Sequence, residues 1–380
     1  MARGLLDRRR FFQASAASVT AALAGARLPT GSAADAAAGN VIWHNVRDWG
    51  VEGKGWSDTA DDYDRLPRKA EKMVRGPVWS LSRHSAGMLT RFRTNATAIR
   101  VRYRLRSGGL AMPHMPATGV SGLDLYARDG TGRDRWLAVV RPKARNMDVM
   151  LCDGIDAPTG DALRLYTLYL PLYNGVESLE IGVDRAFRFE PVPPRQQKPL
   201  VFYGTSILQG ACASRPGMAF TSIVGRRLNR PVINLGFSGN GLMEPEVGAL
   251  LCELDADIYI IDCLPNMTGD LVAARTVPLV KQLRAARPDV PILLVEDRTY
   301  AHASFRRSAR QRHEASRLAL RKAFDRLQAE GVEGLHYLEG EDLLGKDGEA
   351  TTDGSHPNDL GMMRYADAYE SILRHIVPSA

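Results

Sequence analysis

The stretch VFYGTSILQG, residues 201–210, ends an apolar run at Gly204 and presents Ser206 two residues later. A short apolar run bounded by turn residues predicts a buried strand that stops at the glycine. Glycine suits such a turn because it has no Cβ to restrict its backbone, but the turn does not require a serine. Ser206 alone is explained equally well as a helix cap or a hydroxyl turn, so its role depends on what the rest of the chain places beside it.

Residues 200–380 alternate between short apolar runs and amphipathic segments. The pattern predicts strands at 200–203, 231–236, 257–263, 291–297 and 334–340, and helices at 217–228, 245–254, 270–286, 308–330 and 358–376. Strands that alternate with helices indicate an α/β domain with a parallel sheet covered on both faces. Ligands of such sheets bind beyond the carboxyl ends of the strands, and Ser206 follows one of these ends.

Residues 40–190 have a different periodicity. Segments such as AIRVRYRL (98–105) and LRLYTLYLPLY (163–173) carry apolar residues at every second position. This period predicts an all-β sandwich or jelly-roll domain, in which only residues 60–75 are compatible with a helix. Residues 190–199, EPVPPRQQKP, hold four prolines, a composition not expected to continue a strand or helix, so residues 191–199 are predicted to link the two domains.

The first 38 residues resemble an export signal. Residues 8–12, RRRFF, match the twin-arginine pattern, an Ala-rich stretch follows, and Ala-Asp-Ala at 34–36 fits a cleavage site. A basic tail or a membrane anchor is the alternative, but the apolar run is short and diluted by polar residues, so a stable membrane span is not expected. We therefore expect recognition by the twin-arginine machinery and export to the periplasm or beyond.

The charge of the chain argues against nucleic acid as a partner. The net charge is +7, and residues 1–38 contribute five arginines and two aspartates to it. Outside this segment the sequence has no block of Lys and Arg with interleaved aromatic residues, which nucleic-acid-binding surfaces commonly show.

No metal or cofactor is expected. The sequence has four cysteines: Cys152, Cys212, Cys252 and Cys263. They lack the C-x-x-C spacing of zinc sites. Buried free thiols are favoured over a disulfide, and the sequence leaves the pairing of any disulfide open. The histidines show no H-x-x-x-H spacing. Four of them are expected at the surface or in a polar core: His84, His114, His302 and His313. His302 follows a predicted strand and could instead contact a substrate.

Residues with complementary chemistry follow four of the five predicted strands. They are a serine, a glycine turn, a carboxamide and an aspartate–histidine pair: Ser206, Gly239, Asn266, and Asp353 with His356. A serine hydroxyl becomes a nucleophile when an imidazole removes its proton and a carboxylate orients that imidazole. Backbone N–H groups and an asparagine amide commonly stabilise the oxyanion that then forms. Each residue alone is compatible with a cap or a turn, but together they predict acyl transfer.

These blocks resemble those of the SGNH/GDSL hydrolase superfamily: G-x-S-I-x-x-G at 204–210, the glycine turn, the later asparagine, and D-x-x-H-P at 353–357. The resemblance implies a three-layer α/β/α flavodoxin-like domain over residues 200–380, and it implies that the first half is an accessory β-sandwich as in bacterial members. It also implies the roles of the site residues: Ser206 as nucleophile, Asp353 and His356 as its base pair, and the Ser206 and Gly239 N–H groups with the Asn266 side chain as oxyanion hole.

The chain departs from the family pattern at two places. Thr205 replaces the usual aspartate before the serine, and Leu-Pro-Asn-Met at 264–267 replaces G-x-N-D. If Pro265 displaces the loop, Asn266 would cap a helix and would not bind the oxyanion. The sequence has no G-x-S-x-G elbow, which argues against an α/β-hydrolase.

The sequence therefore predicts an exported serine esterase that removes small acyl groups, such as acetyl, from carbohydrate. A lipid or aryl esterase of the same superfamily is the first alternative, although the loops after the strands are not notably apolar. A non-catalytic carbohydrate-binding protein with an inert Ser206 and His356 is the second. The oligomeric state and the identity of the acyl group stay open.

Overall fold

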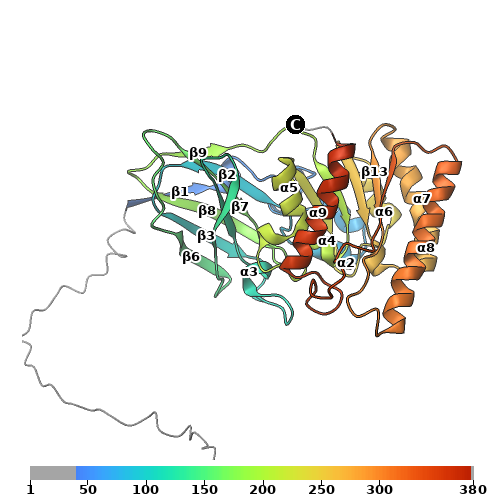
Figure 1. Ribbon diagram of the computed structural model, residues 1–380. Coiled ribbons are helices and arrows are strands. Elements are labelled where there is room, and N and C mark those ends of the chain that lie inside the picture. Colours follow the sequence, from blue (N-terminus) through green and yellow to red (C-terminus); the bar gives the residue numbers. More distant parts are fainter. Residues whose placement is uncertain (1–39, 378–380) are drawn as a thin grey trace, which may run out of the picture. The chain divides into compact units, whose positions relative to one another are not determined.

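Alternation of apolar and polar side chains builds the first half of the protein into two antiparallel sheets. The computed structural model describes residues 40–377, so the predicted export signal at 1–38 lies outside the described residues. One sheet has the order β1-β8-β3-β6, from Val41–Asn45, Val176–Asp184, Ile99–Leu105 and Asn146–Cys152. The other has the order β5-β4-β7-β2-β9, from Asp134–Val139, Asp124–Arg128, Arg164–Tyr169, Leu89–Thr94 and Phe189–Val192. The predicted β-rich region is confirmed, and Figure 1 shows its strands in blue to green.

The inner faces of these sheets share one hydrophobic core. In β3 the side chains of Val101, Tyr103 and Leu105 are buried in it, while the arginines between them point outward. Phe92 of β2 and Tyr166 of β7 enter the same core from the other sheet, with their rings stacked at 5.3 Å. The two-residue period read from the sequence thus separates the core face from the solvent face.

The prediction that the prolines of 190–199 exclude a strand is wrong for the first of these residues. Strand β9 includes Pro191, which pairs with Phe92 of β2 in an antiparallel ladder. Strand β9 is the edge strand of its sheet, so no strand pairs with its open side. Proline has no N–H to donate, and an edge strand tolerates it because no hydrogen bond of the ladder is needed on the open side. The domain boundaries at 190 and 199 stay a prediction.

The helix considered for residues 60–75 forms only in part. A 3-10 helix, η3, spans Arg68–Lys72, and the helix α2 begins later, at Gly76–Ser82. Pro67 disfavours helical backbone in the residue before it, which prevents an earlier start. Four apolar side chains of this region pack into the core of the other half of the chain: Leu66, Ala70, Val74 and Val78.

The second half is a parallel sheet with the order β11-β10-β12-β13-β14. Its strands are Val232–Gly236, Leu200–Gly204, Ile258–Asp262, Ile292–Val295 and Leu335–Leu338. The helices between and after them are α4 to α9, at Ser206–Gln209, Phe220–Leu228, Pro245–Leu251, Gly269–Ala286, Arg307–Ala329 and Asp359–Ile376. The predicted α/β class with a parallel sheet is confirmed.

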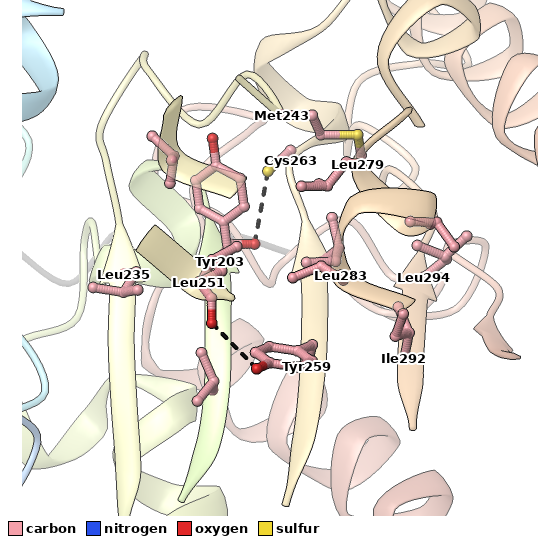
Figure 2. Packing of buried hydrophobic residues seen from close by; sticks show 14 of the residues in the cluster. Tyr203, Leu235, Met243, Leu251, Tyr259, Cys263, Leu279, Leu283, Ile292 and Leu294 are labelled. Carbon is pink, nitrogen blue, oxygen red and sulfur yellow. Dashed lines mark hydrogen bonds between the residues drawn. The ribbon is translucent and has the colours of Figure 1, made fainter. Parts of the chain in front are cut away.

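Helices cover both faces of this sheet. Helices α5 and α9 pack on the face that carries Phe202 and Ile260, and α6, α7 and α8 pack on the face that carries Tyr203 and Ile261 (Figure 1). Figure 2 shows the second face from close by: the Tyr259 hydroxyl donates to the Leu251 carbonyl at 3.1 Å, and the thiol of Cys263 lies 3.7 Å from the Tyr203 carbonyl.

The strand order positions the site. Chain direction across the sheet reverses at β10, because β11 lies on one side of it and β12 on the other. In open α/β sheets of this order the crevice at the reversal point, beyond the carboxyl ends of the strands, is where ligands bind. Ser206 follows the carboxyl end of β10.

Candidate active site

Ser206 is the first residue of the short helix α4, directly after β10. Thr205 caps this helix, with its Oγ1 accepting from the Ile207 N–H at 3.3 Å, and Gly210 ends it at a φ of 107°. The second glycine of the stretch therefore provides a left-handed backbone that few other residues adopt. As the first helical residue, Ser206 has an N–H without a partner in its own helix, so this group can donate to a ligand.

The structure brings Ser206, His356 and Asp353 together. The Ser206 Oγ and the His356 Nε2 lie 2.9 Å apart, and the His356 Nδ1 lies 2.7 Å from the Asp353 Oδ2. These distances correspond to a continuous chain of hydrogen bonds from hydroxyl to imidazole to carboxylate. In such a chain the imidazole accepts the hydroxyl proton while the carboxylate holds the tautomer that makes this possible.

The carboxylate of Asp353 is held ionised by its surroundings. Partial burial by itself would raise its pKa. Hydrogen bonds from the backbone N–H and imidazole of His356, and from the backbone N–H of Ser355, outweigh burial and lower the pKa of Asp353 to about 2. Asp353 is therefore a permanent anion across the pH range in which the protein would work.

A buried arginine supports the loop that carries this pair. Arg298, which follows β13, donates from Nε to the Ser355 carbonyl at 3.3 Å and from its terminal nitrogen to the Ser355 hydroxyl. Its guanidinium also pairs with Asp297. Since Ser355 lies between Asp353 and His356 in the chain, these hydrogen bonds from Arg298 hold the loop that carries both residues.

The glycine turn after β11 packs directly on the end of β10. The Phe237 N–H donates to the Gly204 carbonyl at 2.9 Å, and the Asn240 N–H closes the turn onto the Phe237 carbonyl at 2.8 Å. Gly239 adopts a φ of 70° there, and a side chain at Gly241 would collide with the Gly204 carbonyl. The Gly239 N–H has no hydrogen-bond partner within residues 40–377 and is free to bind a ligand.

Asn266 is bonded to this same turn. In the amide orientation that matches its neighbours, its Oδ1 accepts from the backbone N–H groups of Asn240 at 3.0 Å and Gly241 at 3.2 Å. This leaves the amide N–H groups of Asn266 available to donate elsewhere. Helix α7 is capped by Thr268, whose Oγ1 accepts from the Leu271 N–H at 3.3 Å, so the alternative that Asn266 caps the helix is wrong.

A residue that the sequence interpretation assigned to the surface or a polar core lies beside this site. The imidazole of His114 has its centroid 5.8 Å from that of His356, with a tilt of 43°. His114 is at the tip of a tight turn in which the N–H groups of Met112 and Met115 each donate to the other residue's carbonyl at 3.0 Å. We call residues 112–116 the histidine finger.

The histidine finger is anchored in the second half. Met115 is buried in the core that contains Phe202 and α9, and a side chain at Gly119 would strike the Ala213 carbonyl. Just after the finger, the Thr118 hydroxyl donates to the Ser214 carbonyl at 2.6 Å. The finger is thus fixed over the segment that follows α4.

Other residues of the first half form hydrogen bonds with helix α4, which begins at Ser206. The Tyr173 hydroxyl donates to the Ser206 carbonyl at 3.1 Å. The Gln209 amide of α4 donates to the Leu172 carbonyl at 3.0 Å, and its oxygen accepts from the Ser238 N–H at 3.1 Å. The first half therefore supports both helix α4 and the glycine turn, which no local sequence pattern indicated.

Three other histidines pack against neighbouring residues of the fold. His302 packs against Gly354, within the loop of Asp353 and His356, where a side chain at that glycine would collide with its ring. His84 lies 3.1 Å from the Gln209 amide, and burial, Arg65 and Arg106 lower its pKa to about 3, so it is neutral. His313 is buried and stacked on Tyr300.

All four cysteines are free; Cys212 and Cys263 are buried, as expected, whereas Cys152 and Cys252 are partly exposed. Within residues 40–377 no group of histidine, cysteine, aspartate or glutamate side chains is arranged to hold a metal ion. No helix in the same range has the length and apolar character needed to cross a membrane.

Comparison with known proteins identifies the family. Residues 197–374 match the model of the GDSL-like lipase/acylhydrolase family, and residues 41–189 match that of the N-terminus of SGNH-hydrolase-type esterases. A crystal structure of a Bacteroides ovatus protein described as a GDSL-like lipase is 32% identical, covers 89% of this chain and 98% of its own, and superposes with a TM-score of 0.84. The protein belongs to the GDSL-like lipase/acylhydrolase family, and it is an ester-hydrolysing enzyme.

More distant structures share the fold. The salicylyl-acyltransferase SsfX3 from a tetracycline biosynthetic pathway is 20% identical, with 90% of this chain and 99% of its own covered and a TM-score of 0.70. A family two carbohydrate esterase from Cellvibrio japonicus is 11% identical, with coverages of 88% and 98% and a TM-score of 0.57. A search of curated protein sequences finds no match.

Proposed function

We propose that the protein is a serine esterase that removes small acyl groups from carbohydrate by a Ser-His-Asp mechanism. The observation that carries this proposal is the hydrogen-bonded chain from the Ser206 Oγ through His356 to Asp353, with distances of 2.9 and 2.7 Å. It joins a nucleophile to a base that a permanent anion orients.

The reaction follows from this geometry. As the Ser206 Oγ attacks the acyl carbon, its proton passes to the His356 Nε2, and the carbonyl oxygen becomes an oxyanion. The Ser206 and Gly239 N–H groups and the Asn266 amide are the donors available to that oxyanion. When the carbon–oxygen bond of the ester breaks, the departing alcohol takes the proton from His356. A water molecule, activated in the same way, then releases the acid from the acyl-enzyme.

A sugar as the alcohol portion is supported by the surroundings of His356. The departing oxygen must come within hydrogen-bond distance of the His356 Nε2, and the ring of His114 lies 5.8 Å from that of His356, centroid to centroid. A second imidazole on the rim of the site suits a hydroxyl-rich alcohol, because it can donate or accept a hydrogen bond. Carbohydrate esterases among the more distant structures share the fold, which is compatible with such a substrate.

A lipid or aryl ester is the second candidate. The observation that favours it is Phe305, which is 91% exposed on the loop after β13 that also carries His302. His302 packs against Gly354 in the loop of Asp353 and His356, and a large exposed apolar ring on the same loop as His302 can contact an acyl chain or an aromatic alcohol. The family membership as an ester hydrolase speaks against the alternative of an inert carbohydrate-binding protein.

The test is release of free acid from acetylated polysaccharide, p-nitrophenyl acetate and phospholipid by the wild type and Ser206→Ala. The variant should lose about 10³-fold or more in kcat on every substrate the wild type cleaves, with an unchanged melting temperature, because only an Oγ is removed. Near-wild-type turnover by the variant would contradict the triad. Acid release from phospholipid but not from polysaccharide would leave the triad intact and replace the substrate class.

We further propose export by the twin-arginine machinery, on the basis of Arg8, Arg9 and Arg10. Replacing all three by lysine keeps the charge but removes the pair that the receptor reads, so the variant should remain in the cytoplasmic fraction. Replacing Arg27 by lysine, in the same segment, is the matched control. Unchanged export of the triple variant would indicate a general secretory signal.

A further inference from the structure

A groove of about 530 Å³ lies far from the candidate active site, along the outer face of the sheet that contains β2. Its lining combines four arginines with three carboxamides and two aliphatic side chains: Arg91, Arg93, Arg128, Arg195, Gln196, Gln197, Asn229, Leu165 and Val192. Arg195 precedes β10 and Asn229 precedes β11, so the groove opens at the amino ends of these strands. Ser206 lies at the opposite edge, beyond the carboxyl end of β10.

Two of the arginines share one carboxylate. Arg91 pairs with Glu52 at 2.5 Å, and Arg195 pairs with the same side chain at 2.8 Å. Glu52 is buried, while the arginine side chains are 15% and 19% exposed at the groove. One of the two positive charges is therefore uncompensated, and the Arg91 Nε is buried without a hydrogen-bond partner in the described part of the chain.

The other charges of the groove add to this excess. Arg128 pairs with Asp134 at 2.9 Å. Arg93 is exposed and makes no ion pair among residues 40–377; its cross-strand neighbour Glu190 pairs with Arg188 at 2.9 Å. Glu52, Asp134 and Glu190 are thus each already paired with an arginine, and the groove lining itself holds four arginines and no carboxylate.

A separate cavity of about 30 Å³, the room of one water molecule, shares Arg91, Arg128, Arg195 and Asn229 with the groove and is also lined by Arg226. The guanidinium of Arg226 donates to the carbonyls of Ser222 at 3.2 Å and Gly217 at 2.8 Å, and lies 4.2 Å from the Tyr126 ring centroid. Its charge is satisfied by dipoles, so it adds to the positive potential that reaches the groove.

We propose that this groove binds carboxylate groups of an acidic polysaccharide, such as a chain of uronic acid residues. Guanidinium groups match the planar carboxylate with two parallel hydrogen bonds, and the carboxamides of Gln196, Gln197 and Asn229 can bind the sugar hydroxyls. The binding site is separate from the candidate active site and anchors the enzyme to a polymer. It goes beyond the proposed esterase function and does not depend on turnover.

The composition of the groove disfavours other polyanions. Binding of single-stranded nucleic acid relies on aromatic side chains that stack with bases. The groove lining contains no aromatic residue, and Tyr169 lines only the neighbouring cavity, which has room for one water molecule. Attachment to an anionic membrane uses exposed large apolar side chains beside the basic ones. None of the exposed large apolar residues of the described chain is in the groove lining: Ile42, Met73, Trp136, Met150, Phe305, Leu318, Leu360 and Met363.

The test is calorimetric titration of the purified protein with a short oligogalacturonate, at physiological salt, against a neutral maltooligosaccharide of the same length. The wild type should bind the acidic oligomer and not the neutral one. Arg93→Glu and, separately, Gln197→Glu should each weaken binding about tenfold or more, because each places a negative charge in the groove. Both residues are exposed, so folding should be unaffected.

Arg141→Glu is the matched control, since Arg141 is exposed, lies outside the groove lining and undergoes the same change of charge. Equal weakening by this control would overturn the proposal in favour of general electrostatic attraction. Equal binding of the neutral oligomer would overturn it, as would binding of inorganic sulfate as tightly as the oligomer. The proposal would also be overturned if the protein bound an oligonucleotide or an anionic vesicle through Arg93 and did not bind the oligogalacturonate. Titrations with Ser206→Ala should give the same affinity, which separates this site from hydrolysis.

Discussion

The imidazole of His114 lies 5.8 Å from that of His356, centroid to centroid, although the two residues come from opposite halves of the chain. The finger that carries His114 is closed by two backbone hydrogen bonds and anchored by buried Met115. His114 is thus held in place beside the histidine that would protonate the departing alcohol. Its position predicts an effect on the alcohol portion of the substrate and not on the acyl portion.

His114→Ala should lower kcat/KM for an acetylated sugar about tenfold, the size of one lost hydrogen bond to a polar ligand. The same variant should leave the preference between p-nitrophenyl acetate and p-nitrophenyl butyrate unchanged, because that ratio reports acyl recognition. The deacylation rate should also be unchanged, since the alcohol has left by then. Pro113→Ala, in the same turn, controls for loosening of the finger. A changed acyl preference, or an equal effect of both variants, would contradict the assignment of His114.

Asp353→Asn should lower kcat on the order of 10³–10⁴-fold, because an amide can present an N–H to the imidazole and favour the wrong tautomer. Since the pKa of Asp353 is lowered to about 2, its carboxylate stays ionised above about pH 4, so protonation of Asp353 should cause no loss of wild-type activity there. The kcat of wild type and variant is measured side by side, and a variant kcat within about tenfold of wild type would contradict the role of Asp353 in orienting His356.

Asn266→Ala tests the oxyanion donor that Pro265 put in doubt. The Oδ1 of Asn266 is fixed by the N–H groups of Asn240 and Gly241, which directs its own N–H groups away from that turn. If these donate to the oxyanion, kcat should fall about 10²–10³-fold while KM moves little, because the donor matters most in the transition state. The melting temperature should be measured beside it. A lowered melting temperature with kcat within about threefold would give Asn266 a structural role only.

Asp262→Asn should raise the melting temperature more at pH 8 than at pH 5. Asp262 is fully buried at the end of β12, where it accepts from the Tyr369 hydroxyl at 2.8 Å, and burial raises its pKa to about 7 from 3.8. The folded protein therefore binds a proton that the unfolded chain has already lost, so this residue destabilises the fold progressively as pH rises from about 4 through 7. An asparagine accepts the same hydrogen bond without that cost. Asp58→Asn, at an exposed position, is the control, and an equal shift at both pH values would contradict the prediction.

The elements of the α/β half were predictable because each has a local period. The helix expected at 270–286 is found at Gly269–Ala286, and the strand expected at 257–263 is found at Ile258–Asp262. The placement of Ser206, Asp353 and His356 was predictable for the same reason: parallel strands direct their carboxyl ends to one edge. The residues that follow those ends therefore meet, whatever the details of the helices.

What could not be predicted depends on contacts between the halves. His114 has no local pattern that links it to His356; the one signal is that Pro113 and Pro116 flank the turn that displays it, which indicates a rigid loop. The strand at Pro191 was missed because a proline is compatible with an edge strand, and edge position is a property of the whole sheet. The capping role of Thr268 was missed because Asn266 and Thr268 are both residue types that cap helices. Only the position where α7 begins shows that the Thr268 hydroxyl is the group that accepts from the helix.

The bonds of Arg65 determine which parts of this enzyme can be exchanged with a relative. Its buried guanidinium donates to the carbonyls of Gly236 at 2.7 Å and Asn234 at 3.1 Å in β11, and to those of Leu81 and His84 in its own half. A chimaera that brought in a foreign first half without this arginine would leave the β11 carbonyls without a donor at the strand that leads to Gly239. The two halves therefore have to be exchanged together, whereas the histidine finger, residues 112–116, is a segment short enough to be transferred between relatives by itself.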